Sequence, residues 1–201
     1  MAMTILYPVG EHLYVNLTNK CPCACTFCIR QNGDGAYGSD SLWLAHDPSL
    51  DEVKKAFAAW NLEDFTELVF CGYGEPTEAL DILLAAAEYA KSLPGCPPVR
   101  LNTNGLSDLI HGKKTAHLLE GLIDTVSISL NAGTEKEYMA VTRPKWENSF
   151  AAMQQFASDC KRYVKRVMFT VVDVIPPEEI EAAQAVADKL GIQLRVRKYD
   201  S

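Results

Sequence analysis

Residues 13–28 read LYVNLTNKCPCACTFC and join a short apolar segment to a cluster of cysteines. The first six residues, LYVNLT, are rich in branched and aromatic side chains, which favour a β-strand. Cysteines follow at positions 21, 23, 25 and 28. In α/β folds with parallel strands, functional residues gather where the strands end. The segment therefore predicts a strand that delivers a thiol-rich loop to a site.

The pattern of strand, loop and helix recurs along the chain. Further strand-like segments are ELVFCG, VRLNTN, TVSISLN, VMFTVVDV and LRVRKY, at residues 67–72, 99–104, 125–131, 167–174 and 194–199. Helical patterns occupy residues 49–60, 79–93, 115–122, 146–163 and 177–190, and another begins at Thr134. Ser49 with Glu52, and Thr134 with Glu137, have the spacing of capping boxes. The alternation predicts a parallel sheet with right-handed crossovers.

Six strand–helix units are too few for a closed eight-stranded barrel, which usually needs about 250 residues. We therefore expect a single α/β domain over residues 1–201, built as a partial, TIM-like (β/α)6 barrel of parallel strands or as an open doubly wound sheet. In both folds the carboxyl ends of the strands form one mouth. The polar residues that follow each strand are expected to converge there.

Composition restricts the class of protein. Apolar residues make up 48% and charged residues 22% of the 201 residues, which is typical of a globular domain. No apolar run reaches the roughly 18 residues that span a bilayer, and the N-terminus lacks a signal-peptide pattern. We expect a cytoplasmic protein without a membrane segment. The net charge of −7 opposes bulk nucleic-acid binding, which depends on neutralising phosphates.

The clustered cysteines favour metal binding over disulfides in a reducing compartment. Thiolates suit zinc or iron–sulfur clusters. A structural zinc site usually needs two ligand pairs, and no second pair of cysteines or histidines has the required spacing. A cluster with all four cysteines, as in an electron carrier or sensor, has a spacing unlike that of ferredoxins. Alternatively, Cys21, Cys25 and Cys28 can hold three corners of a [4Fe–4S] cube and leave the fourth iron open.

The C-x-x-x-C-x-x-C spacing after the first strand resembles that of the radical S-adenosylmethionine (SAM) superfamily. The resemblance implies a [4Fe–4S] cluster and SAM as cofactors, with Cys21, Cys25 and Cys28 as metal ligands. It implies that the open iron binds the amino and carboxylate groups of SAM. Reductive cleavage then yields a 5′-deoxyadenosyl radical that abstracts hydrogen from a substrate. Cys23 is not needed as a ligand, and an electron donor such as flavodoxin or ferredoxin is implied.

The resemblance extends to the other strand ends. The GYGEP sequence at 72–76 resembles the family's GGEP motif, although Tyr73 stands where the family often has glycine. TNG at 103–105 and SLNAGT at 129–134 resemble the motifs that follow later strands, with Asn131 replacing the commoner aspartate. The residues that the resemblance implies as SAM contacts are Phe27, Gly72, Tyr73, Gly74, Glu75, Asn102, Ser129, Asn131 and Val172.

Some residues remain outside these motifs. Arg195 and Arg197 alternate on the last strand, so both are expected on one face, where they would bind an anionic substrate or the SAM carboxylate. Arg143 is a further candidate for a carboxylate or substrate contact. Cys71 is expected in the core. Cys96 and Cys160 are too isolated to build an auxiliary cluster.

The substrate is not evident from the sequence. The small size resembles the activase-like members and a group associated with TatD-type hydrolases, which implies such a hydrolase as a partner. Because the chain ends at Ser201, directly after the last strand, we expect an open mouth. An open mouth suits a protein or peptide substrate, or a partner that acts as a lid. The long loop at residues 31–48 is expected to shield the cluster or to meet a partner.

Overall fold

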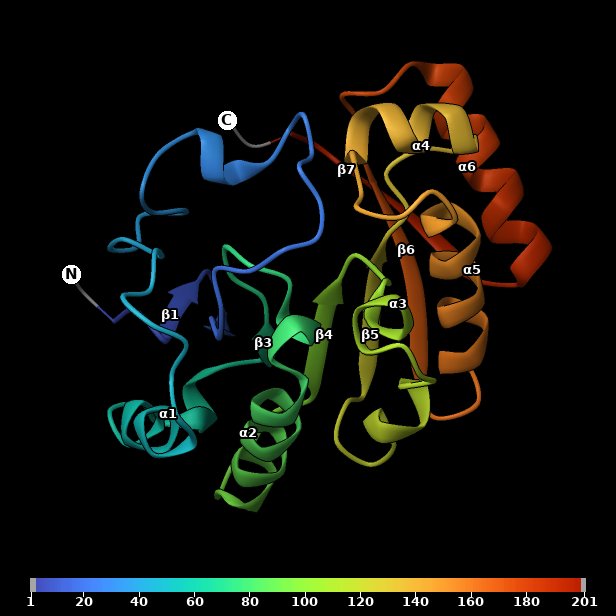
Figure 1. The fold of residues 1–201 in the computed structure, drawn as a ribbon. Coiled ribbons are helices and arrows are strands. Elements are labelled where there is room, and N and C mark those ends of the chain that lie inside the picture. The colour runs from blue at the N-terminus through green and yellow to red at the C-terminus, as the bar shows by residue number, and fades with distance from the viewer. Residues whose placement is uncertain (1–2, 200–201) are drawn as a thin grey trace.

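The computed structural model describes residues 3–199, which form one seven-stranded sheet with helices packed along one face (Figure 1). The strands are β1 Leu6–Val9, β2 His12–Val15, β3 Glu67–Phe70, β4 Val99–Thr103, β5 Thr125–Ser129, β6 Arg166–Val172 and β7 Gln193–Arg197. Their spatial order follows the sequence from β1 to β7. Strand β1 is antiparallel to β2, and all later neighbours are parallel. This order is that of a partial barrel, since a doubly wound sheet reverses its strand order.

The helices are α1 Leu50–Phe57, α2 Leu80–Ser92, α3 Ser107–His111, α4 Glu135–Thr142, α5 Ser149–Cys160 and α6 Pro177–Leu190. Short 3-10 helices occupy Ile29–Gln31, Leu62–Asp64, Pro76–Ala79 and Ala116–Leu119. The predicted capping box of α1 is confirmed, because Ser49 and Glu52 exchange both hydrogen bonds. Among the described residues, no helix has the length and apolarity needed to cross a membrane.

Alternation along the strands divides the sheet into two chemically different faces. One face is apolar and fully buried against the helices; it carries Leu13, Val15, Leu68, Phe70, Val99, Leu101, Val126, Ile128, Phe169 and Val171. The intervening residues, among them Asn102, Ser127 and Thr170, line a cavity on the other face. The main hydrophobic core therefore lies between the sheet and the helices, whereas the inner face mixes polar side chains with apolar ones such as Tyr7, Tyr14 and Met168.

One strand was missed, and one helix was predicted wrongly. Strand β1 was missed; it pairs with β2 through a hairpin in which Val9 lies opposite His12. Its Pro8 weakens the strand pattern, and proline is tolerated here because β1 is an edge strand. The helix predicted at 115–122 is only a short 3-10 turn, and the unpredicted α3 precedes it. Helix α3 stops at Gly112, which has the left-handed conformation (φ 62°).

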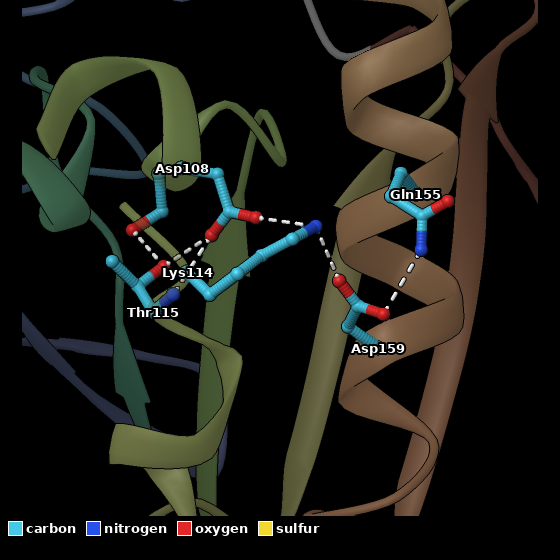
Figure 2. Close-up of polar contacts among 6 residues, drawn as sticks. Asp108, Lys114, Thr115, Gln155 and Asp159 are labelled. Carbon is cyan, nitrogen blue, oxygen red and sulfur yellow. Dashed lines mark hydrogen bonds and ion pairs between the residues drawn. The ribbon is translucent and has the colours of Figure 1, made fainter. Parts of the chain in front are cut away.

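Polar side chains join α3 and its following loop to α5 (Figure 2). Lys114 Nζ lies 3.1 Å from Asp108 Oδ2 and 2.7 Å from Asp159 Oδ2. Asp108 Oδ1 also accepts a hydrogen bond of 2.9 Å from the backbone amide of Thr115. Because the Lys114 side chain is 62% exposed, these ion pairs orient the loop more than they stabilise the fold.

A second polar junction holds the loop after β5 against the start of α6. Glu179 Oε2 accepts hydrogen bonds of 3.0 Å from the backbone amides of Gly133 and Thr134, and Oε1 accepts one of 2.8 Å from Thr134 Oγ1. Thr134 Oγ1 in turn accepts from the Glu137 amide, at 3.3 Å. The capping box predicted for α4 is therefore only half formed, because Glu179 takes the Thr134 amide.

Replacing Glu179 with alanine is expected to lower the free energy of unfolding by about 1 to 2 kcal/mol, because three hydrogen bonds to a carboxylate are lost. Glu178→Ala is the matched control, since the neighbouring Glu178 is exposed and has no side-chain hydrogen bond within the described residues. Urea unfolding followed by circular dichroism measures both variants. Equal midpoints for the two would contradict the assigned role of Glu179.

Candidate functional site

A cavity of about 910 Å³ lies on the inner face of the sheet and reaches the carboxyl ends of the parallel strands. It brings together all the residues that the sequence assigned to metal or cofactor: Cys21, Cys25, Phe27, Cys28, Gly72, Tyr73, Gly74, Glu75, Asn102, Ser129, Asn131 and Val172. The expected convergence of the strand ends is confirmed. Arg195 and Arg197 also line the cavity, as expected from their shared face. Arg143 does not; it is exposed at the end of α4, with φ 47°.

The cysteine loop is held in place by a segment more than a hundred residues later in the chain. The Ala24 amide donates to the Thr142 carbonyl at 3.1 Å, and the Thr26 amide donates to the Val141 carbonyl at 2.9 Å. In return, the Lys145 amide donates to the Pro22 carbonyl at 3.0 Å. These backbone contacts attach residues 22–26 to the end of α4 and orient the thiols toward the cavity.

The four cysteines of this loop all line the cavity. Cys23 is buried, and its Sγ lies 3.7 Å from Asn104 Nδ2. The Cys23 thiol lowers the pKa of Cys21 and of Cys25, while those two thiols and burial raise the pKa of Cys23 itself. The sequence placed Cys23 in the site only in the four-cysteine alternative, and the structure places its thiol in the cavity lining. The C-x-C-x-C spacing offered no signal for this position.

The thiol chemistry of these cysteines and their position beside the cavity fit an iron–sulfur cluster, although they do not form a preassembled metal site. Within residues 3–199, no three or more His, Cys, Asp or Glu side chains form a site for a metal ion. A [4Fe–4S] cube binds each cysteine through a different iron, so its ligands lie further apart than those of a single ion. Three soft thiol donors beside an open cavity fit such a cluster.

The glycines of the GYGEP loop are explained by close contacts within the chain. A Cβ atom on Gly72 would lie 2.0 Å from Asn16 Oδ1, and one on Gly74 would lie 2.2 Å from the Thr18 carbonyl oxygen. Both neighbours belong to the segment between β2 and the cysteines. The glycines therefore let the loop after β3 pack directly against the loop after β2, which places the backbone of residues 72–74 at the cavity wall.

Glu75 is a buried carboxylate that joins two strand ends. Its Oε1 accepts hydrogen bonds from Thr77 Oγ1 (2.8 Å) and Thr103 Oγ1 (2.7 Å), and also from the Thr77 amide (3.1 Å). Its Oε2 accepts one from the Asn104 amide (2.7 Å). Burial raises the pKa of the Glu75 carboxyl, and these hydrogen bonds oppose that rise. Because Oε2 accepts only one of the four, it retains a lone pair for a cation in the cavity.

Tyr73 has a structural role that its sequence motif did not indicate. Its side chain is only 4% exposed, and its hydroxyl lies 2.7 Å from the Gly33 carbonyl oxygen and 2.9 Å from that of Gly35. Its ring packs edge-on against Trp43, with centroids 5.1 Å apart. Tyr73 therefore fastens the loop at residues 31–48 beside the cavity. From this loop, Asn32 Nδ2 also reaches Tyr199 Oη, at 3.3 Å.

The inner wall offers polar atoms without partners inside the protein. Asn102 Oδ1 is buried and has no hydrogen-bond partner among the described residues, although it lines the cavity. Such an atom costs free energy unless a ligand or water satisfies it. The side-chain amide of Asn131, in contrast, already has a partner within the protein, because Nδ2 donates to Thr142 Oγ1 at 3.2 Å. Cys71, expected in the core, faces the cavity, and burial raises the pKa of its thiol.

Glu75→Gln is expected to lower the free energy of unfolding by about 2 to 3 kcal/mol, because the new amide group must turn a donor toward the donors that surround it. The control is Glu78→Gln, which removes the same charge three residues later, where no side-chain hydrogen bond is lost within the described chain. Chemical unfolding at pH 7 compares the two. A Glu75→Gln variant as stable as the control would show that the four hydrogen bonds are dispensable.

The comparisons with known proteins agree with this geometry. The family described as the Radical SAM superfamily matches residues 15–190. The fold is similar to that of Streptococcus suis SuiB bound to S-adenosylmethionine (TM-score 0.64, 18% identity, 96% of this chain and 40% of that chain). It is also similar to HydG, a maturase of the [FeFe]-hydrogenase (TM-score 0.64, 13% identity, 94% of this chain and 42% of that chain). A third similar structure is methylornithine synthase, PylB (TM-score 0.58, 9% identity, 94% of this chain and 53% of that chain).

The chain thus spans about half or less of the length of each of these solved structures. Among curated proteins, none gives a significant match. The family match covers most of the chain, and the three structural neighbours share its partial barrel. The chain belongs to the radical SAM superfamily.

Proposed function

We propose that Cys21, Cys25 and Cys28 hold the [4Fe–4S] cluster of a radical SAM enzyme and that SAM occupies the adjoining cavity. The observation that carries the proposal is the convergence of these thiols with the GYGEP backbone on one cavity, which also contains the unpartnered Asn102 Oδ1. When bound together, the cluster and SAM supply a 5′-deoxyadenosyl radical that abstracts hydrogen from a substrate. We further propose that residues 1–201 act as a single radical SAM core domain.

The residues around the cavity have separable tasks in this proposal. The backbone of Gly72, Tyr73 and Gly74 and the free lone pair of Glu75 face the methionyl ammonium. Asn102 Oδ1 accepts a hydrogen bond from the amino-acid part, which satisfies an otherwise unpaired buried atom. Ser129 and Asn131 face the ribose or carboxylate, with the Asn131 amide already held by Thr142.

The adenine is assigned to the same wall, against Val172, with the backbone of Phe27 facing the same base. Both residues line the cavity and are half-buried. Tyr73 also lines the cavity and is hydrogen-bonded to the loop at residues 31–48, and in this proposal that loop limits the access of water. These side chains bind and orient the cofactor and exclude solvent.

A four-cysteine cluster in an electron carrier is the alternative function, and the position of Cys23 is the observation that favours it. Its thiol lies in the cavity beside the Asn104 amide group rather than at the surface. A fourth thiolate ligand would close the iron that SAM needs. The unpartnered Asn102 Oδ1 and the GYGEP backbone at the same cavity favour the enzyme, since a carrier needs no site for an amino acid.

Substitution of single cysteines separates these two functions. After anaerobic reconstitution, Cys21→Ala, Cys25→Ala and Cys28→Ala are each expected to lose most of the bound iron, because the cluster loses one of three ligands. Cys23→Ala is the matched control and is expected to retain both the iron and the change that SAM causes in the electron paramagnetic resonance spectrum of the reduced cluster. Loss of the cluster in Cys23→Ala would support the electron carrier.

The substrate and partners also belong to the proposal. Radical SAM enzymes need a reductant, and we propose flavodoxin or ferredoxin in the cytoplasm as the donor. The cavity reaches the edge of the sheet at β7, where the exposed Tyr199 forms part of its lining. This opening supports a protein or peptide substrate, or a partner of the TatD-type hydrolase class that covers the mouth.

A further inference from the structure

The charged side chains that line the cavity are mostly cationic, although the chain as a whole is acidic. The chain carries a net charge of −7, yet the cavity is lined by five cationic side chains and two carboxylates. The cations are Arg100, Arg166, Arg195, Arg197 and Lys198, and the carboxylates are Glu67 and Glu75. The lining therefore has a net charge of +3 when histidine is neutral and the cysteines are counted as thiols. Such a concentration of one sign attracts ligands of the opposite sign.

Both carboxylates of the cavity already have partners. Glu67 Oε2 forms an ion pair of 3.0 Å with Arg100 Nη2 deep on the inner face, where the Arg100 side chain is only 12% exposed. Glu75 accepts its four hydrogen bonds at the opposite end. Arg166 Nη2 donates to the neutral Gln193 Oε1 at 3.0 Å. Among residues 3–199, neither carboxylate of the lining forms a contact with the arginines of β7.

Arg195 and Arg197 face the cavity without a side-chain hydrogen bond or ion pair anywhere in residues 3–199. They are two residues apart on β7, so their side chains emerge from the same face of the strand. Arg195 lies beside Thr170, which in turn lies beside Ser129, whereas Arg197 lies beside Val172. Two guanidinium groups on one face of β7, at the level of the predicted SAM contacts, suit a carboxylate or phosphate, which arginine binds through paired hydrogen bonds.

We infer that Arg195 and Arg197 bind the anionic group of the substrate, which carries a carboxylate or a phosphate. The inference rests on the proposed function, in which the SAM carboxylate is bound at the cluster. Cys28 lies four residues before Asn32, whose Nδ2 is 3.3 Å from Tyr199 Oη directly after β7, so the end of β7 and the cysteine loop lie at the same mouth of the cavity. An anion held at β7 would therefore keep the rest of the substrate at this mouth, near the cysteines. Lys198, at the rim, adds positive charge at the entrance.

The test is calorimetric titration of the reconstituted, SAM-bound protein with inorganic pyrophosphate and with citrate at fixed ionic strength. The wild type is expected to bind at least one probe, and the preferred probe tells a phosphate from a carboxylate substrate. In the double variant Arg195→Gln, Arg197→Gln, the affinity should fall by about tenfold or more, since several charge-assisted hydrogen bonds are lost. The control is Lys136→Gln, Lys189→Gln, which removes two exposed charges outside the cavity and should retain the affinity.

Several results would overturn the inference. The inference fails if the wild type binds neither probe, or if the double variant binds the probe as tightly as the wild type. It also fails if the control variant loses as much affinity as the double variant. The electron paramagnetic resonance response to SAM is recorded on the same samples. A double variant that loses this response would show that the arginines bind the SAM carboxylate. A wild type without the response would contradict the proposed function, while its titration would still report on the two arginines.

Discussion

A buried carboxylate joins the loops on which the cavity depends. Glu75 accepts four hydrogen bonds from the loops after β3 and β4, and its own amide donates to the Lys20 carbonyl at 2.8 Å, directly before the first cysteine. Removing a carboxylate from water is costly unless donors replace the lost hydration. Because these donors come from separate loops, the loops cannot move apart without exposing an unsatisfied charge. The shape of the cavity at the cysteine end is thereby maintained.

The two faces of the sheet have different tasks, because the outer face stabilises the fold and the inner face forms the cavity. The outer face buries apolar side chains such as Leu68, Leu101 and Phe169 against the helices, and this burial supplies most of the stabilisation. The inner face carries asparagine, serine, threonine and arginine side chains around the cavity. Polar residues are tolerated there because the cavity is open to ligand and solvent.

Much of this arrangement could be predicted, and the failures have local causes. The parallel strands and the convergence of their ends followed from alternation and from the polar motifs. Strand β1 was missed because Pro8 interrupts its pattern and only its edge position makes proline acceptable. The second half of the α4 capping box failed because Glu179, 45 residues away, takes the Thr134 amide. Ser127 and Thr170 were overlooked in the cavity, although alternation with buried neighbours placed them on its face.

The sequence by itself determined what depends on short-range spacing: the strand and helix periodicity, the cysteine spacing, the GYGEP loop and the shared face of Arg195 and Arg197. These features need only neighbours within a few residues. Tertiary structure alone decided that the Cys23 thiol enters the cavity, because residues 22–26 are held by backbone contacts with the end of α4. It also decided that both β7 arginines lack an acidic partner within the described residues. Partners of buried polar groups come from distant segments, and only the folded chain brings those segments together.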